Sequence, residues 1–136
     1  MTDFELINAD DDVFNELVGH FPEYNAAHSS WNCQTYCIVH KVEGEIIAGG
    51  RGIVNMGALE VRGLWVDEEL RGSGVGSRIL AAIEDEARRR GASRVMLYTY
   101  SWQAQTFYEK AGYTVFSTFD YPDGYQRVDM QKELGR

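Results

Sequence analysis

A glycine-rich turn between an apolar run and an amphipathic run is the first place where this sequence offers chemistry. Residues 64–80 read LWVDEELRGSGVGSRIL, in which Arg71 is followed by Gly72, Gly74 and Gly76. Glycines let a backbone approach a ligand closely, and the free N–H groups at the start of a helix attract anions. The sequence therefore predicts an anion site at this turn. The candidate anions are the phosphates of ATP, the pyrophosphate of a dinucleotide, or some other anion.

Residues missing from the turn and from its surroundings disfavour the first two anions. A P-loop ends in Gly-Lys-Ser or Gly-Lys-Thr, whereas here Gly76 is followed by Ser77 and Arg78. The glycine spacing also differs from the dinucleotide fingerprint. In addition, the next predicted strand ends in Leu97-Tyr98-Thr99-Tyr100, without the acidic residue that binds a ribose. Neither ATP nor NAD is expected at this site.

The turn and a second segment together resemble a known family. The pattern Arg71-x-x-Gly74-x-Gly76 is similar to the acyl-CoA pyrophosphate loop of the GCN5-related N-acetyltransferases, the GNAT family. Residues 104–113, AQTFYEKAGY, match that family's A-x-x-x-Y-x-x-x-G-[FY] segment. The resemblance is strongest over residues 58–113 and, through the order of the predicted elements, covers essentially the whole chain. It implies an enzyme that transfers an acetyl group from acetyl-CoA to a primary amine by direct attack.

The resemblance also implies which residues bind the cofactor. Backbone groups of Leu64, Trp65 and Val66 are expected to pair with the pantetheine arm. The pyrophosphate is expected on Arg71, Gly72, Ser73, Gly74, Val75, Gly76 and Ser77. Ser101 takes the position of an asparagine that contacts the cofactor in many members, and its hydroxyl keeps the hydrogen-bonding capacity with a shorter reach. Gly63, inside a predicted strand, favours a bulge that splays this strand from its parallel neighbour.

Acetyl transfer to an amine presents two proton problems, which predict two catalytic groups. An alkyl amine with a pKa near 10.4 is only about 0.04% neutral at pH 7, so a base assists attack, and the departing thiolate benefits from an acid. Tyr108 matches the tyrosine that the family places near the cofactor sulfur, and it is the predicted acid; the alternative is an aromatic that only packs in the core. Glu60, four residues before Leu64, is the predicted base. In the alternative, Glu60 pairs with Arg62 on the same strand face, and ordered water or backbone groups act as the base.

The acceptor is predicted from aromatic and acidic side chains towards the two ends of the chain. In the family, the acceptor site is built largely from the N-terminal helices and the C-terminal hairpin. Here those segments carry Tyr24, Trp31, Asp120, Tyr121, Asp123 and Tyr125. Aromatic faces beside carboxylates suit a cation, so a small cationic amine is the expected acceptor. Two alternatives remain open, namely a protein N-acetyltransferase that acts on lysine or an N-terminus, and a non-catalytic acyl-CoA sensor.

Composition and charge limit the class of protein and its partners. The 136 residues are 44% hydrophobic and 25% charged, which predicts one globular domain over residues 1–136. The net charge of −8 disfavours nucleic acid as a partner; it either gathers cationic molecules or only keeps the protein in solution. The N-terminus lacks a signal-peptide pattern and no apolar run could span a membrane, so a cytoplasmic protein without a membrane partner is expected.

The cysteines and the oligomeric state give weaker predictions. Cys33 and Cys37 would lie about 13 Å apart on one strand, so free thiols are expected rather than a disulfide. No recognised ligand spacing supports a metal site, and none is expected. Exposed strands of the C-terminal hairpin would allow a homodimer.

The predicted elements position these residues in a mixed sheet. Strands are expected at 3–7, 35–42, 45–54, 56–66, 94–100, 113–119 and 125–134. Helices are expected from Asp10 or Asp11, within 21–32, at 74–90 and at 102–112. The strand–helix–strand run over 58–100 implies a parallel crossover. The resulting fold class is α/β (α+β) and GNAT-like. It has a mostly antiparallel sheet of six to seven strands, a central parallel pair splayed at the cofactor site, and about four flanking helices.

Overall fold

The structure, a computed structural model, describes residues 4–8 and 10–135. The chain divides into two compact units, residues 1–31 and 32–136. The interpretation of the whole chain as a single domain therefore stays a prediction. Among the described residues, no helix is both long enough and apolar enough to cross a membrane.

The N-terminal unit contains two short helices. α1 (Asp11–Val18) begins at Asp10, whose carboxylate accepts hydrogen bonds from the backbone N–H groups of Asp12 and Val13 at 3.0 and 3.2 Å. This is the predicted N-cap. α2 (Phe21–His28) follows. The predicted strand at 3–7 is wrong for the described part, because residues 4–8 form neither helix nor strand, and residue 3 lies outside the described residues. A strand needs a hydrogen-bonded neighbour, which the local sequence pattern could not provide.

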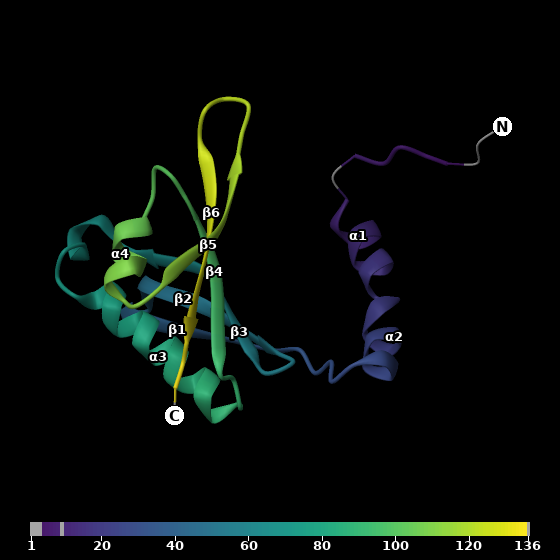
Figure 1. The fold of residues 1–136 in the computed structure, drawn as a ribbon, viewed down its shortest axis with the longest axis horizontal. Helices are drawn as coiled ribbons and strands as arrows, with labels where there is room; N and C mark the ends of the chain where they lie inside the picture. Colours follow the sequence, from purple (N-terminus) through teal and green to yellow (C-terminus); the bar gives the residue numbers. More distant parts are fainter. Residues whose placement is uncertain (1–3, 9, 136) are drawn as a thin grey trace. The chain divides into compact units, whose positions relative to one another are not determined.

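The C-terminal unit is built on one six-stranded sheet (Figure 1). Its strands are β1 (Gln34–Val42), β2 (Glu45–Asn55), β3 (Ala58–Val66), β4 (Arg94–Tyr100), β5 (Thr114–Asp120) and β6 (Gln126–Glu133). They lie in the order β1-β2-β3-β4-β6-β5. Only β3 and β4 are parallel, and every other neighbouring pair is antiparallel. The predicted mixed, mostly antiparallel sheet is confirmed, with six strands.

Two helices lie on the same side of this sheet, as Figure 1 shows. α3 (Val75–Arg89) makes the crossover from β3 to β4, and α4 (Gln105–Lys110) connects β4 to β5. A short 3-10 helix, η1 (Glu68–Leu70), precedes α3 and was not predicted. The apolar face of α3, including Leu80 and Ile83, is buried with Leu59, Val95 and Met130 of the sheet. Burying one such side chain contributes about 1.5–3 kcal/mol, so this layer holds α3 against the sheet.

The parallel pair separates soon after it begins. β3 and β4 pair only at Ala58↔Arg94, Leu59↔Val95 and Glu60↔Met96. Just beyond, the β2–β3 register shifts, so that Gly63 and Leu64 lie opposite the single residue Gly50. Gly63 has a φ of 66°, which glycine adopts readily. The bulge predicted from Gly63 is therefore present, and it leaves the edge of β3 beyond Glu60 without a partner strand.

Candidate active site

The glycine-rich turn forms the start of α3 in the way that an anion site requires. Gly72 and Gly74 have φ values of 80° and 85°, with open space where a Cβ would lie, so backbone conformation rather than crowding favours glycine there. The first hydrogen bond within α3 runs from the Arg78 N–H to the Gly74 carbonyl at 3.2 Å. The amides of Val75, Gly76 and Ser77 precede it, and Gly74 has no side chain to cap them. These N–H groups can therefore bind an anion at the positive end of the helix dipole.

A cavity of about 430 Å³, called the loop cavity here, adjoins this turn. Its walls are the turn itself together with apolar residues of β3, η1 and α4, namely Leu64, Val66, Leu70, Arg71, Gly72, Gly74, Gly76, Ser77, Ala104, Phe107 and Tyr108. Arg71 Nε donates to the carbonyl of Val66 at 3.1 Å, which fixes the arginine at the cavity. An anion-binding turn next to an apolar wall fits a ligand that carries a diphosphate on an apolar arm.

Four of the predicted cofactor residues do not line the loop cavity. The Trp65 side chain is 48% exposed and lines a different hollow, so only its backbone could serve. Val75 is buried in the core, and the Ser73 hydroxyl donates to the Leu70 carbonyl. Ser101 Oγ accepts from the N–H of Gln126 at 3.0 Å, and the Ser101 N–H donates to the Gln126 carbonyl at 2.9 Å. Because this pairing joins β4 to β6, the geometry gives no support to a cofactor contact by Ser101.

Tyr108 of α4 lies between the loop cavity and a second cavity. The second, called the slot cavity here, has a volume of about 290 Å³ and occupies the opening of the splayed strand pair. It is lined by Val61, Arg62, Gly63, Leu64, Tyr98, Thr99, Tyr100, Gln103, Ala104 and Tyr108. Tyr108 is 8% exposed, and its burial raises the pKa of the phenol. The side chain is therefore a neutral proton donor at physiological pH.

Sequence reasoning missed several residues of these cavities, including Phe107, Tyr98, Tyr100 and Gln103. The two tyrosines could have been identified from the alternation of residues along β4. In β4 the residues Val95, Leu97 and Thr99 are buried, so period-two alternation places Tyr98 and Tyr100 on the other face, at the slot. By contrast, Phe107 and Gln103 become site residues only through the packing of α4, which the local sequence does not specify.

Glu60 is the last residue of β3 that pairs with β4. Its carboxylate accepts a hydrogen bond from Nε of Arg62, and the two side chains are 27% and 55% exposed. The Glu60–Arg62 pair is therefore present, as in the alternative in which Glu60 is not the base. Arg62 lines the slot cavity and Glu60 itself is not among the lining residues. The role of Glu60 as a base therefore stays a prediction.

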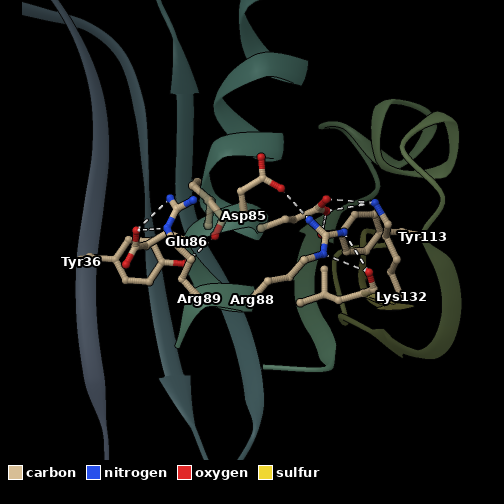
Figure 2. A network of polar contacts seen from close by, with 10 residues as sticks. Tyr36, Asp85, Glu86, Arg88, Arg89, Tyr113 and Lys132 are labelled. Atoms are coloured by element: carbon tan, nitrogen blue, oxygen red, sulfur yellow. Dashed lines mark hydrogen bonds and ion pairs between the residues drawn. The ribbon is translucent and has the colours of Figure 1, made fainter. Parts of the chain in front are cut away.

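A buried ionic cluster, part of the network in Figure 2, adjoins Tyr108 through the ring of Tyr113. The hydroxyl of Tyr113 donates to Glu84 Oε2 at 2.6 Å, and Lys132 Nζ donates to the two oxygens of Glu84 at 3.0 and 3.2 Å. Burial and the hydrogen bond to Glu84 both raise the pKa of Tyr113. The ring of Tyr113 lies edge-on to that of Tyr108, with centroids 5.8 Å apart. The cluster joins α3 to β6 and packs against the proposed acid.

The residues predicted for the acceptor fall into separate groups. Tyr121 and Tyr125 line a hollow near the tip of the β5–β6 hairpin together with Asp123. Asp120 Oδ1 accepts from Nε2 of Gln126 at 2.6 Å, so its carboxylate also fixes the hairpin. Tyr24 and Trp31 belong to the N-terminal unit, and their contribution to an acceptor site stays a prediction.

Comparisons with known proteins agree with this geometry. Residues 4–113 match the acetyltransferase (GNAT) family. A blasticidin-S acetyltransferase of Streptomyces morookaense is 39% identical over 93 residues, which are 67% of this chain and 68% of that protein. A crystal structure from Agrobacterium tumefaciens, whose protein is proposed to be an acetyltransferase, has a TM-score of 0.88 at 25% identity and covers 98% of this chain and 99% of its own.

A fourth comparison bears on the cofactor. An aminoglycoside 6'-N-acetyltransferase in complex with coenzyme A shares the fold, with a TM-score of 0.67 at 18% identity over 93% of this chain and 91% of its own. GNAT enzymes use acetyl-CoA as the acetyl donor, and the loop cavity has the donor groups and apolar wall that this molecule needs. The family match over residues 4–113 and the blasticidin-S acetyltransferase relative together establish that this chain belongs to the GNAT family of acetyl-CoA-dependent N-acetyltransferases.

Proposed function

We propose that this enzyme acetylates the primary amine of a small cationic molecule by direct attack, with Tyr108 as the acid and Glu60 as the base. One observation carries the proposal, namely that Tyr108 lines both the loop cavity and the slot cavity. A ligand held by the glycine-rich turn and an amine that enters through the slot would therefore meet at this side chain. The proposed site thus has a donor side, an acceptor side and a proton donor between them.

Tyr108 has the properties that an acid at this point needs. Acetyl-CoA, when bound, supplies a reactive acyl group and a thiolate that leaves. The phenol of Tyr108 can protonate that sulfur and stays neutral before the reaction, because burial raises its pKa. Backbone N–H groups along the unpaired edge of β3 would stabilise charge that develops on the carbonyl oxygen. This edge is free because β3 and β4 pair no further than Glu60 and Met96.

Glu60 is proposed as the base because of where it lies. It stands at the apex of the opening, where the parallel pairing ends, and its bond to Arg62 connects it to a residue of the slot cavity. A proton from the amine would reach the carboxylate through an ordered water molecule at the slot. Replacing Glu60 with Gln is expected to slow the reaction near pH 7 and to matter less at alkaline pH, where the amine is already neutral.

A small cationic acceptor is supported by charge and by the relatives. The net charge of −8 attracts cations, and Asp123 lies among tyrosines of the hairpin hollow. One relative is named a blasticidin-S acetyltransferase, and one protein with the same fold is named an aminoglycoside 6'-N-acetyltransferase. Both names indicate small-molecule acceptors, and we place the acceptor of this enzyme in the same class.

An acceptor screen tests the proposal. Purified enzyme and acetyl-CoA are incubated with arylalkyl amines such as tyramine, with polyamines, with aminoglycosides, and with a lysine peptide. The release of free coenzyme A is measured. We expect turnover with small amines. Tyr108→Phe should lower kcat about 100-fold while the affinity for acetyl-CoA stays the same, because only a proton donor is removed. Tyr36→Phe is the matched control, since its hydroxyl donates to the Ile83 carbonyl away from both cavities and its loss should leave kcat unchanged.

Two results would contradict the proposal. Turnover restricted to neutral, acidic or peptide acceptors would exclude a small cationic amine. An unchanged kcat in Tyr108→Phe, with the acetyl-transfer step shown to limit the rate, would remove Tyr108 as the acid.

A further inference from the structure

A group of aromatic side chains beside the slot cavity has no role in the donor site or in the acid–base chemistry. Tyr100, Trp102, Tyr121 and Tyr125 surround Asp123 in a hollow of about 330 Å³, called the hairpin hollow here. Trp102 and Tyr125 are 59% and 51% exposed. Large exposed aromatics grouped around one carboxylate are typical of a ligand site rather than of a surface that only has to stay soluble.

The four rings of the hairpin hollow contact one another in defined orientations. The rings of Tyr100 and Trp102 stack with centroids 4.7 Å apart and planes 10° apart. Tyr125 stands edge-on to Trp102 at 5.1 Å and 75°. Tyr121 lies 6.2 Å from Tyr100 at 47°. The four rings thus form a continuous group that lines the hollow.

Backbone and side-chain hydrogen bonds hold both segments that carry these rings. On the Trp102 side, Ser101 is bonded to Gln126 through its N–H and its hydroxyl, and Gln103 Oε1 accepts from the Tyr100 N–H at 3.1 Å. Trp102 therefore lies between two anchored neighbours. This ordering reduces the entropy that a ligand would otherwise have to remove on binding.

The hairpin tip is held in the same way. The Tyr121 N–H donates to the Tyr125 carbonyl at 2.8 Å, and Asp123 Oδ1 accepts from the Tyr125 N–H at 3.2 Å. The carboxylate is therefore fixed among the rings. A hollow made of ordered aromatic faces and one fixed carboxylate is preorganised for a flat ring that carries a positive or hydrogen-bond-donating group.

The hollow adjoins the candidate active site at one shared residue. Tyr100 lines both the hairpin hollow and the slot cavity, and the slot cavity reaches Tyr108. A molecule whose amine lies at Tyr108 would extend past Tyr100 into the hairpin hollow.

We infer that the acceptor is an amine that also carries a flat aromatic ring, and that the ring binds in the hairpin hollow on Trp102 and Tyr125 while the amino group reaches the slot cavity. This inference rests on the proposed function, because it names the class of molecule that occupies the acceptor side of the same site. The ring provides affinity and selects the acceptor, and it takes no part in the proton transfers.

A matched pair of amines tests the inference. 2-Phenylethylamine and 2-cyclohexylethylamine have similar size, but only the first has a flat π system. Because the phenyl group makes the first a weaker base, kcat/KM is expressed per concentration of neutral amine. We expect kcat/KM to favour the phenyl compound about tenfold, since an aromatic pair contributes up to about one factor of ten beyond simple burial. Trp102→Ala and, separately, Tyr125→Ala should abolish this preference, so that the two amines are used with equal kcat/KM. Phe116→Ala is the control, because Phe116 is an exposed aromatic of β5 that does not line the hollow.

Binding without chemistry separates this inference from the proposed function. Each amine is titrated into the enzyme saturated with coenzyme A, which cannot donate an acetyl group, and the NMR signal of the Trp102 indole is followed. Tighter binding of the phenyl compound that is lost in Tyr125→Ala, a variant that keeps the Trp102 indole as the probe, supports the ring site even if neither amine is acetylated. Equal acetylation of both amines, unaffected by Trp102→Ala, overturns the inference and leaves the proposed function intact. If neither amine is acetylated and the indole signal does not shift, both the inference and the proposed function are overturned.

Discussion

Tyr108 is buried like a core side chain, but it also lies where the proposed reaction would take place. It is 8% exposed and packs against Phe107 and Tyr113, yet it lines both cavities of the site. A charged group in such surroundings would be costly, whereas a phenol is neutral and can still donate a proton. The pattern at 104–113 indicated this residue, but its burial could not be predicted because it depends on how α4 packs.

The raised pKa of Tyr108 leads to a prediction about pH. The acid must be protonated, so activity is lost only as pH rises through its pKa, which burial places above the ordinary value of 10.0. We expect kcat/KM to increase with pH as the amine becomes neutral, and to show no descending limb below pH 10. The measurement is a pH profile of kcat/KM for a small amine, taken from initial rates at low amine concentration and saturating acetyl-CoA and corrected for enzyme stability. A descending limb between pH 8 and 9 that disappears in Tyr108→Phe would contradict this prediction.

At the scale of elements, the strength of the local pattern decided what could be predicted. The period-four apolar face of α3, the Glu43-Gly44 turn between β1 and β2, and the Gly63 bulge each have a strong local signature, and each is present. The strand expected at 3–7 was wrong because pairing depends on distant residues. The slot cavity depends on where β3 and β4 separate, and Gly63 located it to within three residues of Glu60.

The conformation of Gly74 gives a prediction with a matched control at the other end of the same helix. Gly74 lies at the start of α3 with a φ of 85°, and Gly91 lies just past its end with a φ of 88°. Neither has an atom within contact of an added Cβ, so alanine at either site should cost about 1–2 kcal/mol through backbone strain alone.

We expect the two alanine variants to have similarly reduced unfolding free energies, measured in urea. Only Gly74→Ala should also weaken binding of coenzyme A, by about tenfold or more in calorimetry, because it distorts the amides that face the anion. Gly74→Asn should recover part of both losses, since asparagine tolerates this conformation better. Equal loss of coenzyme A affinity in Gly74→Ala and Gly91→Ala would show that general destabilisation, and not the anion site, is responsible.

At the scale of the C-terminal unit, α3 is the element to which the other parts are attached. On one side the Tyr36 hydroxyl of β1 donates to the Ile83 carbonyl at 2.5 Å, and the guanidinium of Arg90 lies 4.5 Å from the Tyr36 ring centroid. On the other side, Arg88 donates to the Leu134 carbonyl and Glu84 binds Lys132 and Tyr113 (Figure 2). The helix whose start is the proposed anion site is thus fixed to both halves of the sheet farther along its length.

The Glu84 cluster is the part of these attachments that lies in the interior, and its removal should be costly. Glu84 is 5% exposed, so Glu84→Ala leaves the Lys132 ammonium and the Tyr113 hydroxyl with their main partner removed. Removing one member of a buried ion pair costs about 3–5 kcal/mol, and we expect about 3 kcal/mol because Lys132 is partly exposed. Urea unfolding followed by circular dichroism gives this value. Glu86→Ala is the control, since its pairs with Arg89 and Arg90 are at the surface and their loss should cost clearly less.

An apolar replacement of the whole cluster separates stability from position. The triple variant Glu84→Leu, Tyr113→Phe, Lys132→Met removes every charge together and keeps the volume, so we expect it to recover most of the stability that Glu84→Ala loses. If the cluster also orients Tyr108, the recovered protein should bind acetyl-CoA normally and still show a lower kcat, because the ring against Tyr108 is then fixed by packing alone. A triple variant with normal stability and normal kcat would show that the ionic cluster holds α3 to β6 without positioning the acid.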